Sequence, residues 1–245
     1  QDAPVVPQLH SNIAGNPSAP AVNQNTTVSF QVCGDSINPS APQWSTSDLY
    51  AQAVQGSTTI DFPHVGTSLS TGGCYDYAQS ASLPAGGWWT IRAGYDKDGV
   101  CTSLGEVSGV SNNYPMWVVS GAEMQLQGEM TLGASEVYSG SSTSIQFVVK
   151  NIAGVDLSDH FRVSLYDANG VFITQFADSG NTTLAANGGE YAYNQSQTFN
   201  TPGLYRVVGE HFYNGAWTPI YGNSTKSIIV RSPKPTPPQL AKGMP

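Results

Sequence analysis

The sequence is short of charged side chains. Only 11% of its 245 residues are charged, against about 25% in an average soluble protein. Lys and Arg together number 9 and Asp and Glu 17, which gives a formal net charge of -8. Before Lys150 the only basic residues are Arg92 and Lys97. The chain therefore offers no basic patch for phosphate groups, and we expect no nucleic-acid partner.

Long apolar runs are missing as well. No stretch approaches the ~18 consecutive apolar residues of a transmembrane helix, so the sequence predicts no membrane span. Apolar residues at helical spacing are almost absent, which excludes a helical bundle. Hydrophobic residues still make up 39% and aromatic residues 10% of the chain, more than disordered chains carry. We therefore expect a folded protein.

The chain also lacks a recognisable catalytic or metal-binding motif. Its 4 histidines are scattered, its 3 cysteines lack the Cys-x-x-Cys spacing of a zinc site, and its serines lack a Gly-x-Ser-x-Gly context. The sequence thus predicts no catalytic residue, no metal, no cofactor and no enzymatic activity. A secreted hydrolase with two carboxylates in a cleft between domains stays open as a third hypothesis, because such a pair needs only proximity in space.

The sequence contains an internal repeat. Three apolar residues alternate along one predicted strand, and the same alternation returns about 117 residues later. The first set is Val28, Phe30 and Val32, and the second is Ile145, Phe147 and Val149. The self-match continues at an offset near ~116 through the paired glycines 72–73 and 188–189. A duplication is therefore indicated.

Each copy is predicted to be a sandwich of short strands. Alternating segments separated by turn residues give about seven strands in about 110 residues, which is typical of the immunoglobulin fold. We predict an all-β chain of two tandem immunoglobulin-like β-sandwich domains, at residues 24–120 and 121–231, related by internal duplication.

One motif adds a resemblance. The stretch from Pro202 to Val207 reads Pro-Gly-Leu-Tyr-Arg-Val. It resembles the opening of a late strand in bacterial and archaeal immunoglobulin-like modules of cell surfaces and extracellular filaments, in which the tyrosine occupies a tyrosine-corner-like position. The first copy departs from this motif. The resemblance implies a fold and leaves the function open.

Two proline-rich tails flank the repeats, at residues 1–23 and 232–245. We expect both to be extended. The alternating region of Val5, Val6 and Leu9 is a candidate donor strand, which would add to the sandwich of a neighbouring subunit and build a polymer. The alternative is that the tails fold back on their own domain.

All three cysteines belong to the first copy. In a secreted chain this number implies one disulfide and one unpaired thiol. The repeat favours Cys33 with Cys74, because the equivalent residues in the second copy are Lys150 and Glu190, a suitable cross-strand ion pair. Cys101 is then free, or is the alternative partner of either one.

Four asparagines stand in Asn-x-Ser/Thr sequons and are glycosylation candidates. They are Asn25, Asn181, Asn194 and Asn223.

Aromatic side chains are the candidates for recognition. Along residues 88–95, alternation places Trp89 in the core and Trp88 on the outer face. Other aromatic residues lie near strand ends, where core packing, subunit contact and sugar stacking are all open to them. The contact candidates are Trp88, Trp117, Trp217 and Tyr221.

The function that we expect is structural. The chain starts at Gln1 without a leader segment, which predicts a secreted, extracellular or cell-surface protein whose targeting segment has been removed. We expect a non-enzymatic filament subunit whose partner is a second copy of itself. The alternative is an adhesin or carbohydrate-binding module that uses exposed tryptophans.

Overall fold

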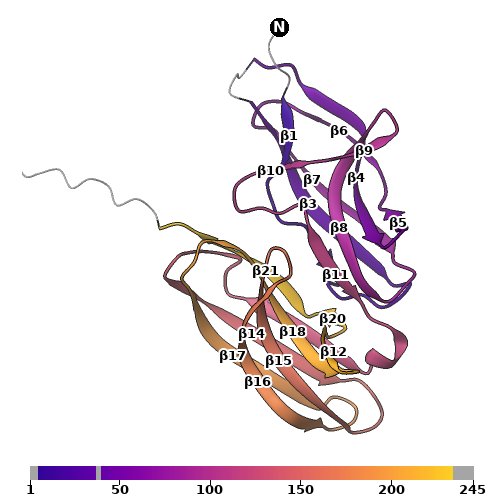
Figure 1. Ribbon diagram of the computed structural model, residues 1–245, viewed down its shortest axis with the longest axis vertical. Helices are drawn as coiled ribbons and strands as arrows, with labels where there is room; N and C mark the ends of the chain where they lie inside the picture. The colour runs from indigo at the N-terminus through magenta and orange to yellow at the C-terminus, as the bar shows by residue number, and fades with distance from the viewer. Residues whose placement is uncertain (1–4, 37–39, 234–245) are drawn as a thin grey trace, which may run out of the picture.

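The computed structural model describes residues 5–36 and 40–233, which form two β-sandwiches in series (Figure 1). The strands of the first are β1 Val6–Leu9, β2 Ala14–Asn16, β3 Asn25–Asp35, β4 Trp44–Gln55, β5 Thr58–Asp61, β6 Val65–Leu69, β7 Cys74–Ser82, β8 Gly87–Lys97, β9 Val100–Ser103, β10 Gly105–Glu106 and β11 Tyr114–Val118. Among the described residues no helix is long and apolar enough to cross a bilayer.

A short 3-10 helix, η1 (Gly121–Glu123), leads into the second sandwich. Its strands are β12 Leu126–Leu132, β13 Glu136–Tyr138, β14 Ser141–Asn151, β15 Leu157–Asp167, β16 Phe172–Leu184, β17 Glu190–Phe199, β18 Gly203–Tyr213, β19 Ala216–Pro219, β20 Gly222–Asn223 and β21 Thr225–Arg231.

The two sandwiches share their pairing pattern. In the first, β3 pairs with β7 in one sheet and β4 pairs with β8 in the other. In the second, β14 pairs with β17 and β15 pairs with β18. The second sandwich consists of a four-stranded sheet, β17-β14-β12-β20, and a sheet of the order β13-β21-β18-β15-β16 with β19 on β18. The all-β, tandem architecture that the repeat predicts is therefore present.

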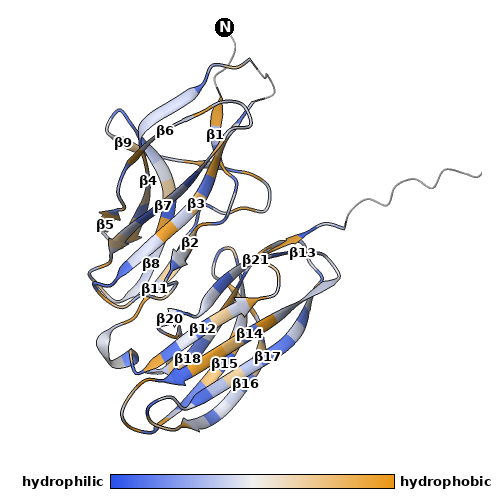
Figure 2. Ribbon diagram, turned by 180° about the vertical axis from the view of Figure 1, so that it is seen from behind, coloured by the Kyte–Doolittle hydropathy of each residue, from blue (hydrophilic) through white to orange (hydrophobic). Residues whose placement is uncertain are grey.

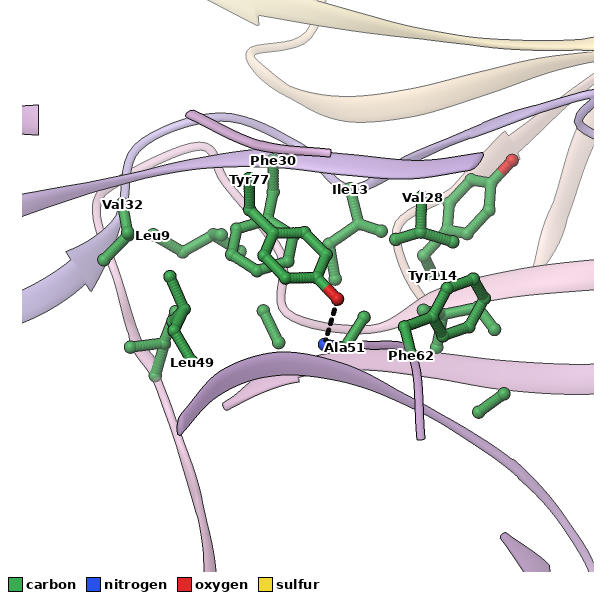
Figure 3. Packing of buried hydrophobic residues seen from close by; sticks show 14 of the residues in the cluster. Leu9, Ile13, Val28, Phe30, Val32, Leu49, Ala51, Phe62, Tyr77 and Tyr114 are labelled. Atoms are coloured by element: carbon green, nitrogen blue, oxygen red, sulfur yellow. Dashed lines mark hydrogen bonds between the residues drawn. The ribbon is translucent and has the colours of Figure 1, made fainter. Parts of the chain in front are cut away.

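Alternation along the strands fills each core from two sheets. Every second residue of β3 is buried, and Phe30 stacks on Tyr77 of β7 at 4.5 Å between ring centroids. The Tyr77 hydroxyl donates to the Pro63 carbonyl at 2.9 Å and accepts from the Ala51 amide at 3.3 Å, the contact drawn in Figure 3. Burial raises the pKa of Tyr77 to about 12.

The second core has a position that only glycine fits. The apolar residues of β14 are visible in Figure 2, and among them Phe147 is fully buried. A Cβ added to Gly209 of β18 would lie 2.0 Å from the Phe147 ring. Residue 209 therefore faces the core, and its neighbours 208 and 210 face outward.

The first sandwich begins before residue 24, so the expected boundary is wrong. β1 pairs antiparallel with β3 from Val6 to Leu9, and β2 continues along the same edge of β3. Val5 and Leu9 are 1% and 0% exposed. The N-terminal segment folds back onto its own domain because its apolar side chains complete this core.

The candidate donor residues are consequently not free to pair elsewhere. Val5 and Leu9 lie in the core of their own sandwich, and Val6 alone points outward, with 53% of its surface exposed. The proline-rich tail contributes only residues 232–233 to the described part of the chain, and residues 1–4 and 234–245 lie outside it.

The structure contains a disulfide between Cys33 and Cys74, the pair that the repeat favours. The two residues face each other across β3 and β7. At the equivalent place Lys150 and Glu190 face each other across β14 and β17, and Lys150 Nζ lies 3.1 Å from Glu190 Oε1. Cys101 is free and exposed.

The N-terminal strand yields the first prediction. Leu9→Ala lowers the free energy of unfolding of the first sandwich by about 2–5 kcal/mol, since it opens a cavity in the core. Val6→Ala is the matched control on the same strand, with an expected change below about 0.5 kcal/mol because the side chain is exposed. Calorimetric unfolding measures both. Equal effects of the two substitutions would show that β1 does not pack as described.

The disulfide yields the second prediction. The double variant Cys33→Ala with Cys74→Ala lowers the unfolding free energy of the first sandwich by about 2–4 kcal/mol, because the bridge constrains a long loop of the unfolded chain. Replacing Lys150 and Glu190 by alanine lowers that of the second sandwich by less than about 1 kcal/mol, since the ion pair is exposed to solvent. Calorimetry of both double variants checks the pair. A larger loss in the second sandwich contradicts the prediction.

Candidate functional site between the two sandwiches

Backbone hydrogen bonds join the two sandwiches. Ala19 and Gly222 exchange both of their N–H···O bonds, at 2.9 and 3.0 Å. Next to this bridge the Thr225 amide donates to Ser18 Oγ at 3.1 Å, and Gln24 Nε2 donates to the Tyr221 hydroxyl at 3.3 Å. The end of the N-terminal segment is therefore fixed to β20 and β21 of the second sandwich.

The first sandwich covers the outer face of β18. Gly209 points into the second core, so Arg206, Val208 and Glu210 point away from it. All three are nevertheless buried, at 4%, 6% and 2% exposure. Two charged side chains thus lie in the junction between the domains, where each needs a partner.

Glu210 has its partners on the neighbouring strand β15. Its two carboxylate oxygens accept from Arg162 Nε and from the Tyr166 hydroxyl, each at 2.6 Å. Arg162 Nη2 also donates to the Tyr166 hydroxyl at 3.0 Å. Burial, with the nearby Glu210 charge, raises the pKa of Tyr166 well above its usual range.

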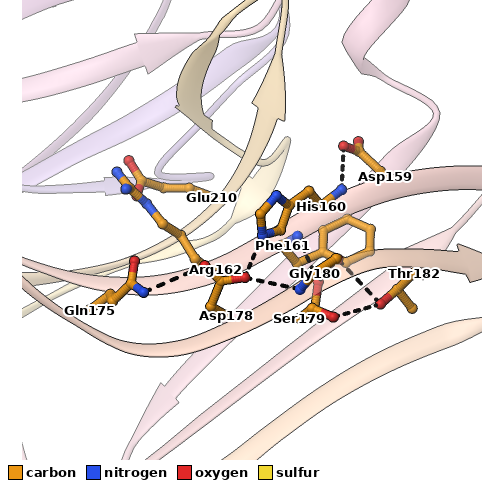
Figure 4. Close-up of polar contacts among 10 residues, drawn as sticks. All are labelled: Asp159, His160, Phe161, Arg162, Gln175, Asp178, Ser179, Gly180, Thr182 and Glu210. Atoms are coloured by element: carbon orange, nitrogen blue, oxygen red, sulfur yellow. Dashed lines mark hydrogen bonds and ion pairs between the residues drawn. The ribbon is translucent and has the colours of Figure 1, made fainter.

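Aromatic rings enclose the Arg162 guanidinium. Its central carbon lies 4.2 Å from the ring centroid of Trp217 and 5.0 Å from that of Phe172. Figure 4 shows Arg162 beside Glu210, with His160 next to it on the same strand bonded to Asp178 of β16. This outer sheet face is a connected layer of ion pairs and aromatic rings.

A cavity of about 270 Å³ lies where this layer meets the first sandwich. Its lining from the first sandwich includes Trp88, Pro115 and Trp117, and its lining from the second includes Tyr166, Arg206 and Glu210. Trp88 and Trp117 are paired across β8 and β11, with centroids 5.1 Å apart. Trp88 is 51% exposed.

Arg162 is paired with the carboxylate of Glu210. Among the described residues Arg206 has no carboxylate partner. Its Nη2 donates to the carbonyls of Asp167 and Ala168. Its Nη1 and the Trp117 Nε1 are buried and have no hydrogen-bond partner among the described residues. Burial lowers the pKa of Arg206, and Tyr114 and Asp167 oppose that shift.

The carboxylates of the cavity bear on the hypothesis of a hydrolase with a carboxylate pair between its domains. Glu210 is its one carboxylate among the described residues, and both of its oxygens are held by Arg162 and Tyr166. A glycosidase needs two carboxyl groups facing the bond to be cleaved. Across the described part of the chain, no group of three or more His, Cys, Asp or Glu side chains is placed to hold a metal ion.

The four aromatic candidates divide between three places. Trp88 and Trp117 come together at the cavity, whereas Trp217 packs on Arg162. Tyr221 lies in the junction, where it accepts from Gln24.

The sequons are placed on strands. Asn25, Asn181 and Asn194 are exposed, while Asn223 is half-buried in β20 beside the bridge between the domains. Their glycosylation stays a prediction.

Sequence reasoning missed Arg206, Glu210 and Tyr166. The available signal was the pattern of β18, in which Arg206 and Glu210 flank Val208 on the face opposite the core. This pattern places the two charges on one outer face but does not show that another domain covers that face.

No family model and no curated protein matches the chain. Among solved structures, the D0-D1 domain of intimin aligns over 91% of this chain and 100% of its own, at 9% identity and a TM-score of 0.42. The CARDB domain of a Pyrococcus furiosus protein covers 44% of this chain and 94% of its own, at 19% identity and a TM-score of 0.33.

The fibronectin(III)-like modules of Clostridium thermocellum CbhA cover 93% of this chain and 95% of their own, at 16% identity and a TM-score of 0.26. These are similarities in fold alone, and with every one of these TM-scores below 0.5 they carry no argument about this chain. The two tandem β-sandwiches rest on the strand pairing described above.

The buried ion pair yields the third prediction. Glu210→Gln keeps the side-chain shape but leaves Arg162 without its counter-charge, so the second sandwich loses about 3–5 kcal/mol of unfolding free energy. Glu190→Gln is the control, with an expected loss below about 1 kcal/mol because its ion pair with Lys150 is exposed. Urea unfolding measures both. A Glu210→Gln variant as stable as the control contradicts the burial described for this pair.

Proposed function

We propose that this protein is a secreted, non-enzymatic module of the cell surface that binds carbohydrate through the cavity between its sandwiches. One observation carries the proposal. Trp88 is 51% exposed at a cavity that both domains line. An exposed aromatic ring beside a cavity offers a flat apolar face on which a sugar ring can stack.

The geometry around Trp88 supports the proposal. Trp117 holds the ring in an edge-to-face contact, at 64° between the ring planes. Trp88 and Trp117 lie directly opposite each other on β8 and β11. The stacking surface is therefore part of a sheet and is preorganised for binding.

A filament subunit is the second candidate, favoured by a different strand. β16 is an edge strand of its sheet, and its first residues, Phe172 and Ile173, are 45% and 46% exposed. Val171, directly before the strand, is 60% exposed. An open apolar edge is a template for pairing with another chain. Self-assembly would then proceed through β16, because Leu9 and the rest of β1 are already engaged in their own sandwich.

A glycan array followed by titration calorimetry tests the binding function. Wild-type protein is expected to bind at least one oligosaccharide, and Trp88→Ala is expected to weaken that binding about tenfold or more, since a lost stacking contact costs on the order of 1.4 kcal/mol. Tyr138→Ala is the control, because Tyr138 is similarly exposed, at 47%, and lies outside the cavity.

Two results decide between the candidates. If no saccharide binds, or if Trp88→Ala and Tyr138→Ala bind alike, the cavity is not the binding site. If sedimentation then shows polymers that Phe172→Lys dissolves, the filament function replaces it.

A further inference from the structure

We infer that the cavity takes an acidic sugar, whose carboxylate binds Arg206 while its ring stacks on Trp88. The inference rests on the proposed function and specifies its ligand class. The starting observation is that two residues of this lining, Arg206 and Trp117, each carry a buried donor atom, Nη1 and Nε1, that has no partner among the described residues. Both atoms are donors only, so a ligand that satisfies them must bring acceptors.

The charges of the lining favour an anion. Glu210 is neutralised by Arg162 at 2.6 Å, which leaves Arg206 as the charge without a paired carboxylate. Arg206 is 4% exposed, and within the described part of the chain its hydrogen bonds go to the carbonyls of Asp167 and Ala168. A buried guanidinium binds a carboxylate more strongly than a neutral acceptor, because the hydrogen bonds are charge-assisted.

Among the described residues neither Tyr114 nor Asp167 forms an ion pair with Arg206, although the nearby Asp167 charge opposes the lowering of the Arg206 pKa. The Tyr114 hydroxyl is buried, and burial raises the pKa of this group, so the phenol stays neutral near Arg206. Asp167 Oδ1 accepts from the backbone amides of Asn169 and Val171 in its own turn, and only the Asp167 carbonyl bonds to Arg206. The cavity thus combines a positive centre with an aromatic wall.

A sugar fits this arrangement better than an extended peptide. Peptides commonly bind sandwiches by adding a strand to a sheet edge. The edge strand at the cavity is β11, and Pro115 in its middle has no N–H to donate. The volume of about 270 Å³ has room for one ring-sized group, at the lower end of known ligand pockets.

Calorimetric titration with trigalacturonate and with its neutral methyl ester tests the inference. The wild-type protein is expected to bind the acid about tenfold or more tightly than the ester, since a charge-assisted pair outweighs a neutral contact by this order. Arg206→Gln is expected to remove that preference while keeping ester binding. Salt is expected to weaken binding of the acid alone.

Thermal unfolding of the Arg206→Gln variant shows whether this variant folds. If it does not, a second variant tests the inference. Trp117→Phe keeps an aromatic ring and removes the donor Nε1, so it is expected to weaken binding of both probes several-fold. The wild-type preference for the acid, together with this loss, then decides the inference.

Each failure has its own signature. Equal affinity for acid and ester, with loss of both in Trp88→Ala, overturns the acidic specificity and leaves carbohydrate binding intact. Absence of any saccharide binding overturns both proposals. Binding of an oligoglutamate peptide that depends on Arg206, without binding of trigalacturonate, replaces the sugar by an acidic protein segment.

Discussion

Burial of two opposite charges on one strand is the constraint on which the junction depends. Arg206 and Glu210 sit on the outer face of β18, where an isolated sandwich would expose them to water. The first sandwich covers both, and desolvating a charge is costly unless another group replaces the water. The arrangement of Arg162, Tyr166 and the 167–168 carbonyls follows from that requirement.

The N-terminal segment serves both domains. Its first half supplies Val5 and Leu9 to one core, and its second half supplies Ser18 and Ala19 to the junction. This proline-rich segment thus makes contacts with both domains that a flexible linker would not make. These contacts explain why the two sandwiches meet at a defined place and are not connected through the short helix η1 alone.

The sequence predicted what depends on local alternation. The burial of Trp89 follows from a period of two residues along a strand. The repeat has a constant offset, and this offset places the Cys33–Cys74 pair at the position of the Lys150–Glu190 pair. The alternation of residues 5–9 predicted a strand there but not its partner, because alternation does not say which sheet edge a strand joins; β1 pairs with β3 of its own sandwich. Subtracting the repeat offset from the residue numbers of β12 places an equivalent strand close to β2. The high proline content of this segment favoured an extended tail instead.

The site was beyond sequence reasoning for a different physical reason. Trp88 and Arg206 come from separate domains, and no local pattern fixes how two sandwiches pack against each other. The exposure of Trp88 is predictable from alternation along β8. The cavity beside it is not predictable in this way, because residues of both domains line it.

The backbone bridge between Ala19 and Gly222 adjoins that cavity, since Ser18, next to Ala19 in the chain, belongs to the lining. Its two hydrogen bonds involve no side chain, and Gly222 has a positive φ of 106° with the Gly128 carbonyl 2.8 Å from where a Cβ would be. The domains are thereby joined by main-chain atoms as well as by the covalent connection and by side-chain bonds such as that of Thr225 to Ser18. Because the bridge uses only main-chain atoms, substitutions of the side chain at residue 19 leave its two hydrogen bonds available.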